Sequence, residues 1–181
     1  MRLSQLQIFF LATSLAVWPA TLRAAPVYTV EMSDVDEHKL STADGHVTII
    51  VLARSTEVDR VRTVGDRVPE SCIGNPAQRF ITLLTFEQKH AKPARMLMNV
   101  LARRRLDAEA KRLQARYTAK KLTGEPRHDV FAVLDFDGTI AAHLEVAPSV
   151  TFQVMVLGRS GELLARWNEV PPADELAEAL R

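Results

Sequence analysis

The chain has 181 residues, of which 47% are hydrophobic and 25% are charged, and its formal net charge at pH 7 is +1. These values are typical of an ordinary globular protein with one domain and exclude a low-complexity chain. Because the net charge is close to zero, it does not indicate any particular class of partner.

Residues 1–24 have the pattern of a secretory signal peptide. Arg2 gives a short basic start, an apolar run extends from Ile8 to Trp18, and Ala24 precedes a cleavage site. The run is shorter than the roughly 20 residues of a spanning helix. We therefore expect a periplasmic or secreted protein with no transmembrane segment in the mature chain. Cleavage removes the positive charges of Arg2 and Arg23 and changes the net charge from +1 to −1.

Cys72 is the only cysteine, so the chain cannot form an internal disulfide. Free cysteines are usually buried. We expect Cys72 to be a small, partly buried residue. Pairing with another chain and reaction as a free thiol remain open alternatives.

The first elements after residue 24 are strands. Val27–Met32 alternates weakly and predicts a short strand, and the polar stretch Asp34–Gly45 predicts a loop. Val47–Ala53 is a nearly continuous β-branched run, which is typical of a strand covered on both faces.

Two helices and a second strand follow. Ser55 begins a predicted helix with a hydroxyl cap, and this helix runs to Pro69. Phe80–Phe86 predicts a buried strand. Pro93 is a favourable first residue for a long helix that ends near Leu122. The apolar members of this helix are Met96, Leu97, Val100, Leu101, Leu106, Ala110 and Leu113.

The C-terminal third predicts two more buried strands, Val130–Leu134 and Val150–Leu157. A tight turn, Gly158–Gly161, leads into Glu162–Trp167, so these last two strands form a hairpin. A final helix is expected from Ala173 to Leu180.

The order of elements predicts an α/β fold. Strands that alternate with helices are expected to be parallel neighbours joined by right-handed crossovers, whereas the last pair is antiparallel. We expect a mixed sheet with helices on both faces, closed by a hairpin and a helix. Residues 25–45 form an N-terminal extension with a possible short strand, and residues 46–181 form the domain.

This order, with its final hairpin and helix, resembles the thioredoxin-like fold over roughly residues 46–181. The most telling part is Leu134-Asp135-Phe136-Asp137-Gly138 followed by the run from Val154 to Leu163. This pair of segments resembles the periplasmic YtfJ family, a thioredoxin-like group. The resemblance implies an envelope-associated domain.

Active thioredoxins carry a Cys-x-x-Cys pair at the start of the helix after the first core strand, where the helix dipole lowers a thiol pKa. This chain has Arg54, Ser55, Thr56 and Glu57 at that position. Disulfide exchange and peroxidatic chemistry are therefore excluded. We expect a redox-inactive domain without a cofactor, with Arg54, Ser55 and Thr56 as candidate binding residues.

The run Asp135-Phe136-Asp137-Gly138-Thr139 favours a second hypothesis, because it also resembles the start of a haloacid-dehalogenase-type phosphatase site. In that family the first Asp attacks phosphorus, the second handles the proton, and Mg²⁺ is required. Asp135 and Asp137 are thus candidate catalytic residues. However, no lysine follows Lys121 to hold a phosphate. The alternative is that both residues end a strand and begin a turn.

The long helix favours a third hypothesis, in which residues 92–121 bind an anionic surface or an acidic envelope protein. Nucleic acid is not expected, because Tyr117 is the only aromatic residue in this segment. The alternative is a solvated face with acidic neighbours. The five histidines lack metal-ligand spacing, so no metal is expected. The candidate binding residues on the helix are Arg103, Arg104, Arg105, Lys111 and Arg112.

Overall fold

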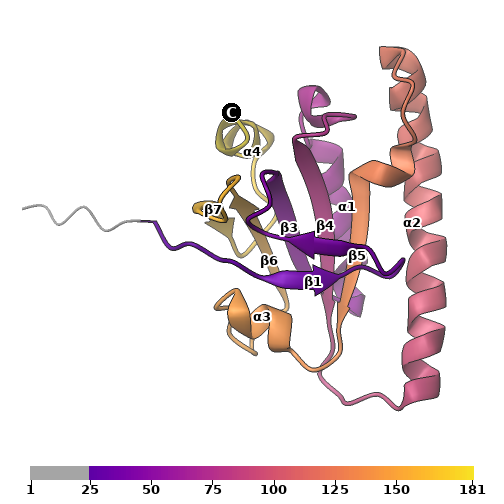
Figure 1. The fold of residues 1–181 in the computed structure, drawn as a ribbon, viewed down its shortest axis with the longest axis vertical. Coiled ribbons are helices and arrows are strands. Elements are labelled where there is room, and N and C mark those ends of the chain that lie inside the picture. The colour runs from indigo at the N-terminus through magenta and orange to yellow at the C-terminus, as the bar shows by residue number, and fades with distance from the viewer. Residues whose placement is uncertain (1–24) are drawn as a thin grey trace, which may run out of the picture.

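The computed structural model describes residues 25–181, so the predicted signal peptide lies outside the described residues. A five-stranded mixed sheet with strand order β5-β4-β3-β6-β7 forms the centre of the domain (Figure 1). Its strands are β3 (Val47–Arg54), β4 (Gln78–Thr85), β5 (Val130–Asp135), β6 (Phe152–Leu157) and β7 (Leu163–Trp167).

The directions of the strands agree with the prediction. Strands β3, β4 and β5 are parallel, whereas β6 is antiparallel to both β3 and β7. The register aligns Arg54 with Thr85, and Thr85 with Asp135. Since parallel strands end at the same edge, the two regions that the sequence singled out, around Arg54 and Asp135, lie along one edge of the sheet.

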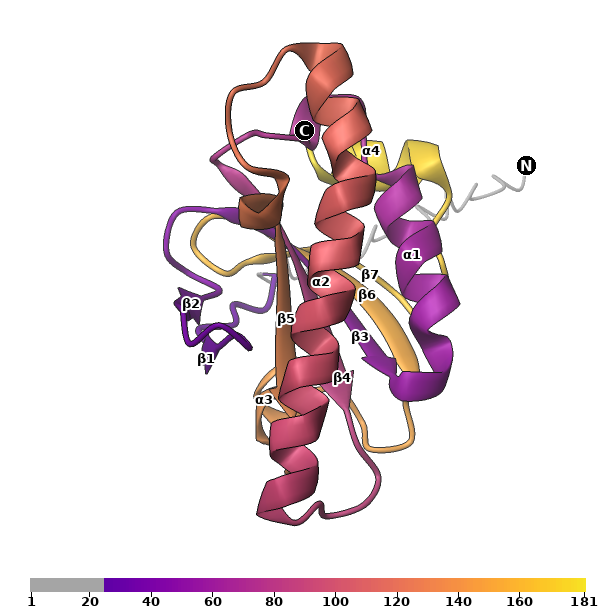
Figure 2. The same cartoon turned by 90° about the vertical axis from the view of Figure 1, so that its right-hand side faces the viewer.

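Helices lie on both faces, as expected. Helix α1 (Val58–Arg67) and α4 (Ala173–Ala179) pack on one face, and α2 (Lys92–Lys120) runs along β5 at the edge (Figure 2). The opposite face carries α3 (Thr139–His143) and the hairpin of β1 (Glu31–Ser33) and β2 (Lys39–Ser41) (Figure 1). Three short 3-10 turns complete the structure, η1 (Ser55–Glu57), η2 (Glu70–Cys72) and η3 (Pro126–Asp129).

The central strands separate two cores. In β3, Ile50 and Leu52 pack towards the β1–β2 hairpin, whereas Ile49 and Val51 pack towards α1 and α4. All four side chains are buried. A strand buried on both faces needs apolar residues at every position, which explains the uninterrupted β-branched run.

Several details differ from the prediction. The stretch 34–45 contains β2, which pairs with β1, instead of being only a loop. Helix α3 lies in the segment for which no element was predicted. Ser55 does not cap a helix: it lies in η1, and neither η1 nor α1 has a side-chain cap. β2 and η1 have three residues each and α3 has five, so the periodicity of the sequence indicates these elements poorly.

Helix α2 is continuous through the three consecutive arginines 103–105. It begins with a proline in its first turn and ends at Lys120, and the next residue, Lys121, caps it with a left-handed φ of 56°. Among residues 25–181, no helix combines the length and the apolar character needed to span a bilayer.

Candidate functional site

Arg54 is the last residue of β3 and connects three segments at the carboxyl edge of the sheet. Its backbone N–H donates to the Thr151 carbonyl oxygen at 3.0 Å. Its guanidinium donates to the Pro148 carbonyl oxygen at 3.2 Å and forms an ion pair with Glu87. Ser55 and Thr56 follow and are exposed. A cation held in place by its neighbours therefore occupies the end of β3.

A groove of about 470 Å³ lies beside these residues, between the ends of β3 and β4 and the N-terminal half of α2. We call it the strand-end groove. Its lining includes Phe86, which stacks on Phe136 with ring centroids 4.9 Å apart. The groove is lined by, among others, Arg54, Ser55, Thr56, His90, Leu101 and Arg105. The structure thus joins the candidate residues Arg54, Ser55, Thr56 and Arg105 in one concave site.

The N-terminal half of α2 exposes large apolar side chains, which the sequence analysis counted only as the apolar members of that helix. Met96 is 70% exposed and Leu97 59%, and Val100 and Leu101 are 43% and 48% exposed. We call these four residues the α2 apolar patch. Only further along do Ala102, Leu106 and Tyr117 become buried. Contiguous exposed apolar surface is typical of interaction sites.

The basic candidates on α2 fall into two groups. Arg103 pairs with Asp36 at 3.1 Å, and Arg112 pairs with Glu109 at 2.8 Å. In contrast, Arg104, Arg105 and Lys111 are exposed and have no ion pair among residues 25–181. Neighbours therefore compensate Arg103 and Arg112, while the other three are available to an external anion.

Asp135 lies at the end of β5 and is only 2% exposed. Its carboxylate accepts the Ala141 N–H at 2.8 Å and so holds the start of α3 against the strand. Burial raises the pKa of this carboxyl group, and the neighbouring Asp137 adds to the rise. Asp137 is exposed and accepts the Thr139 N–H at 3.2 Å. These contacts favour the strand-end and turn interpretation, because a nucleophile must be accessible to its substrate.

Cys72 lies in η2, beyond the C-terminal end of α1, and is buried. Burial raises the pKa of its thiol. A thiol with a raised pKa is a poor nucleophile, because the thiolate is the reactive form. Cys72 is therefore the expected small residue in a structural position, and it is more deeply buried than the partly buried residue that we expected.

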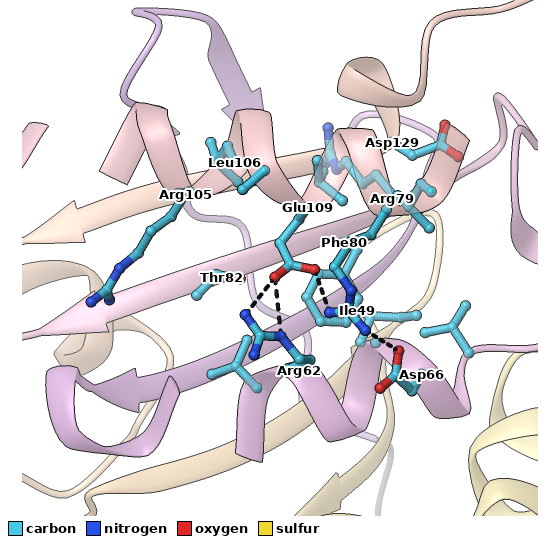
Figure 3. Close-up of a pocket in the computed structure, with 18 of the residues that line it drawn as sticks. Ile49, Arg62, Asp66, Arg79, Phe80, Thr82, Arg105, Leu106, Glu109 and Asp129 are labelled. Carbon is cyan, nitrogen blue, oxygen red and sulfur yellow. Dashed lines mark hydrogen bonds and ion pairs between the residues drawn. The ribbon is translucent and has the colours of Figure 1, made fainter. Parts of the chain in front are cut away.

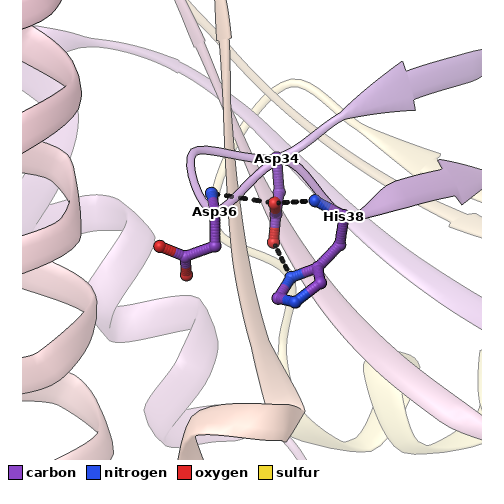
Figure 4. Close-up of side chains that lie close together, drawn as sticks. All are labelled: Asp34, Asp36 and His38. Carbon is purple, nitrogen blue, oxygen red and sulfur yellow. Dashed lines mark hydrogen bonds and ion pairs between the residues drawn. The ribbon is translucent and has the colours of Figure 1, made fainter.

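The sequence analysis missed one group of side chains that could ligate a metal ion, namely Asp34, Asp36 and His38 (Figure 4). Their alternating positions, i, i+2 and i+4, were the signal that could have found it. The Asp34 carboxylate accepts the N–H groups of Asp36 and His38 at 2.9 and 2.8 Å and lies 2.9 Å from His38 Nδ1. Asp36 pairs with Arg103 and Arg127. The oxygens thus have protein partners, and the cluster stabilises the turn of the β1–β2 hairpin.

No protein-family model matches the chain, and no curated protein is significantly similar to it. Solved structures are similar in fold. The exposed lipoprotein thioredoxin of Streptococcus pneumoniae has a TM-score of 0.52 at 10% identity, covering 84% of this chain and 97% of that one. StoA from Bacillus subtilis has 0.50 at 15% identity, covering 87% and 99%. A secreted thiol-disulfide isomerase from Corynebacterium glutamicum has 0.50 at 12% identity, covering 92% and 95%.

The chain therefore has a thioredoxin-like fold. At these identities the similarity concerns the fold alone, and a function has to be argued from the residues of the site.

Proposed function

We propose that this protein is an exported, redox-inactive thioredoxin-like domain with a binding role in the cell envelope. The observation that carries the proposal is the identity of the residues at the end of β3. Where a thiol-disulfide enzyme needs a thiolate, this chain has Arg54 followed by Ser55 and Thr56. The only cysteine is buried beyond the other end of α1. Without an accessible thiolate, the domain has no nucleophile for disulfide exchange.

We further propose that the domain is periplasmic and YtfJ-like. The support is the segment Leu134–Gly138 followed by the hairpin of β6 and β7, together with the signal-peptide pattern of residues 1–24.

The partner that fits the surface is a protein segment with apolar anchors and acidic residues. The α2 apolar patch is continuous with the strand-end groove at Leu101, which belongs to both. Arg104 and Arg105 follow on the same helix and have no ion pair among residues 25–181. Apolar side chains would supply affinity, and the two cations would select acidic neighbours.

Site-specific photo-crosslinking tests this surface. The protein is produced in its own cells with a photoreactive residue in place of Leu97. After illumination, one discrete covalent adduct with the partner is expected. Val100→Glu places a charge in the patch and is expected to reduce the adduct about tenfold. The matched control is a photoreactive residue at Leu164, an exposed apolar position on β7 (48%). Equal adducts at both positions, or none at Leu97, would contradict the proposed surface.

A second candidate function is docking on anionic lipid. It is favoured by the unpaired group Arg104, Arg105 and Lys111. Binding to phosphatidylglycerol vesicles should fall steeply between about 50 and 200 mM salt, since screening weakens contacts between exposed charges. The variant with glutamine at all three positions should not bind. Salt-insensitive binding, or no binding, would eliminate this candidate.

A further inference from the structure

A cavity of about 430 Å³ lies between α1 and α2 (Figure 3). Its floor is the sheet, with Ile49, Phe80 and Thr82, and Val61 and Leu106 line it from the two helices. Protein interiors have few voids larger than a water molecule. Ligand pockets have volumes of roughly 300–1,000 Å³ and are mostly apolar. The cavity therefore has the size and character of a small-molecule site.

Charged side chains cover the solvent side of this cavity. Glu109 extends from α2 towards α1 and accepts hydrogen bonds from Arg62 at 3.1 and 2.9 Å (Figure 3). Arg112 donates to Glu109 at 2.8 Å and to Asp66 at 3.4 Å. These ion pairs join the two helices, while apolar residues line the space beneath them.

The cavity continues into the strand-end groove, because Leu84, Ala102 and Arg105 line both. Arg105 extends from α2 at the end of the cavity opposite to Asp129 (Figure 3). The groove side also offers His90, whose buried Nδ1 has no hydrogen-bond partner among residues 25–181. An apolar space with an unpaired cation at one end matches a ligand with an aliphatic chain and an anionic head.

We propose that this cavity binds a medium-chain fatty acid such as laurate. The aliphatic chain lies between α1 and α2, where its methylene groups are removed from water. The carboxylate meets Arg105 at the junction with the groove, since a guanidinium binds a carboxylate through two parallel hydrogen bonds. The two proposals share Arg105, whereas the space between α1 and α2 is used by the fatty acid alone.

Titration calorimetry with laurate, below its micelle concentration, tests the proposal on the purified chain. One laurate per chain is expected. Dodecanol lacks the charge and hexanoate lacks the long chain, so both should bind more weakly. Arg105→Gln should weaken laurate binding about tenfold or more, as expected for the loss of a charge-assisted pair. Arg159→Gln is the control, because Arg159 is exposed and lines neither the cavity nor the strand-end groove, and it should bind as the wild type does.

Filling the cavity provides a second, independent test. Gly65 lines the cavity from α1, and a Cβ atom at this position would meet nothing within 4 Å. Gly65→Leu should therefore occupy the space, and leucine favours a helix more than glycine does, so the variant should fold. Laurate binding is expected to be lost while the circular dichroism spectrum is unchanged. The proposal is overturned by absence of saturable binding to the wild type, by wild-type binding in a folded Gly65→Leu variant, or by undiminished binding in Arg105→Gln.

Discussion

Arg79, at the start of β4, donates two hydrogen bonds to the carboxylate of Asp44, at 2.8 and 2.9 Å. The Arg79 guanidinium also donates to the Thr48 hydroxyl at 3.0 Å, and the residue is only 7% exposed. The pair thus fastens the segment that follows the β1–β2 hairpin to the central sheet.

This pair predicts a loss of stability in acid. Burial raises the pKa of Asp44, but hydrogen bonds from Arg79 and His46 outweigh it and lower the pKa from 3.8 to about 2. Because the folded pKa is depressed, the stabilisation is complete above about pH 4 and is lost as the pH falls towards 2. We expect a contribution of about 1–2 kcal/mol after solvent screening. Urea unfolding between pH 2 and 6 measures it, and Asp44→Asn should flatten this part of the profile.

His46→Ala is the matched control for that experiment. It removes the partly exposed contact between His46 and Asp44 and keeps the buried guanidinium paired. The expected change is below about 1 kcal/mol, whereas Asp44→Asn should cost the full contribution of about 1–2 kcal/mol at neutral pH by leaving the charge of Arg79 uncompensated. Equal losses in the two variants would show that Arg79 is not the partner that matters.

Two substitutions at Asp135 separate its structural from its catalytic interpretation. Asparagine keeps an acceptor for the Ala141 N–H and removes a buried charge, so the free energy of unfolding should change by less than about 1 kcal/mol. Alanine leaves that N–H without its acceptor and should cost about 1–3 kcal/mol.

The wild type and Asp135→Asn are then assayed for hydrolysis of a phosphomonoester with Mg²⁺. We expect no turnover by the wild type above the level of Asp135→Asn. Turnover that disappears in the asparagine variant would restore the phosphatase hypothesis and identify Asp135 as its nucleophile.

Cys72 should react slowly with a thiol reagent in the native protein. Burial raises its pKa, so little thiolate is present near pH 8. Modification by a chromogenic disulfide is expected to be at least about tenfold slower in buffer than in denaturing urea. Cys72→Ser gives the background rate. Rapid native modification would contradict the assignment of Cys72 as a buried, inert thiol and reopen the redox interpretation.

Two glycines should respond to alanine in opposite directions. Gly74 has a φ of +69°, and an added Cβ would lie 2.6 Å from Leu122 Cδ1 at the end of α2. Gly74→Ala should therefore cost about 1–2 kcal/mol. Gly65 is helical with open space around it, so Gly65→Ala should gain about 0.5–1 kcal/mol. Thermal unfolding measures both, and destabilisation by Gly65→Ala would contradict the open space beside α1.

The sequence by itself determined the main elements of the sheet and their directions. A β-branched run such as Val47–Ala53 favours a strand that is buried on both faces. Strands that are joined by helices are parallel neighbours in the sheet. The sequence also determined the absence of a thiol at the strand end, since that follows from the residues 54–57 alone.

The tertiary structure alone decided which side chains are buried and which residues far apart in the sequence contact one another. Helical spacing groups Met96 with Val100, but it cannot tell whether another element packs on that face, and here none of the described residues buries them. Asp44 and Arg79 are 35 residues apart, and no local pattern connects them. The cavity between α1 and α2 has the same origin, because the separation of two helices depends on the sheet beneath both of them.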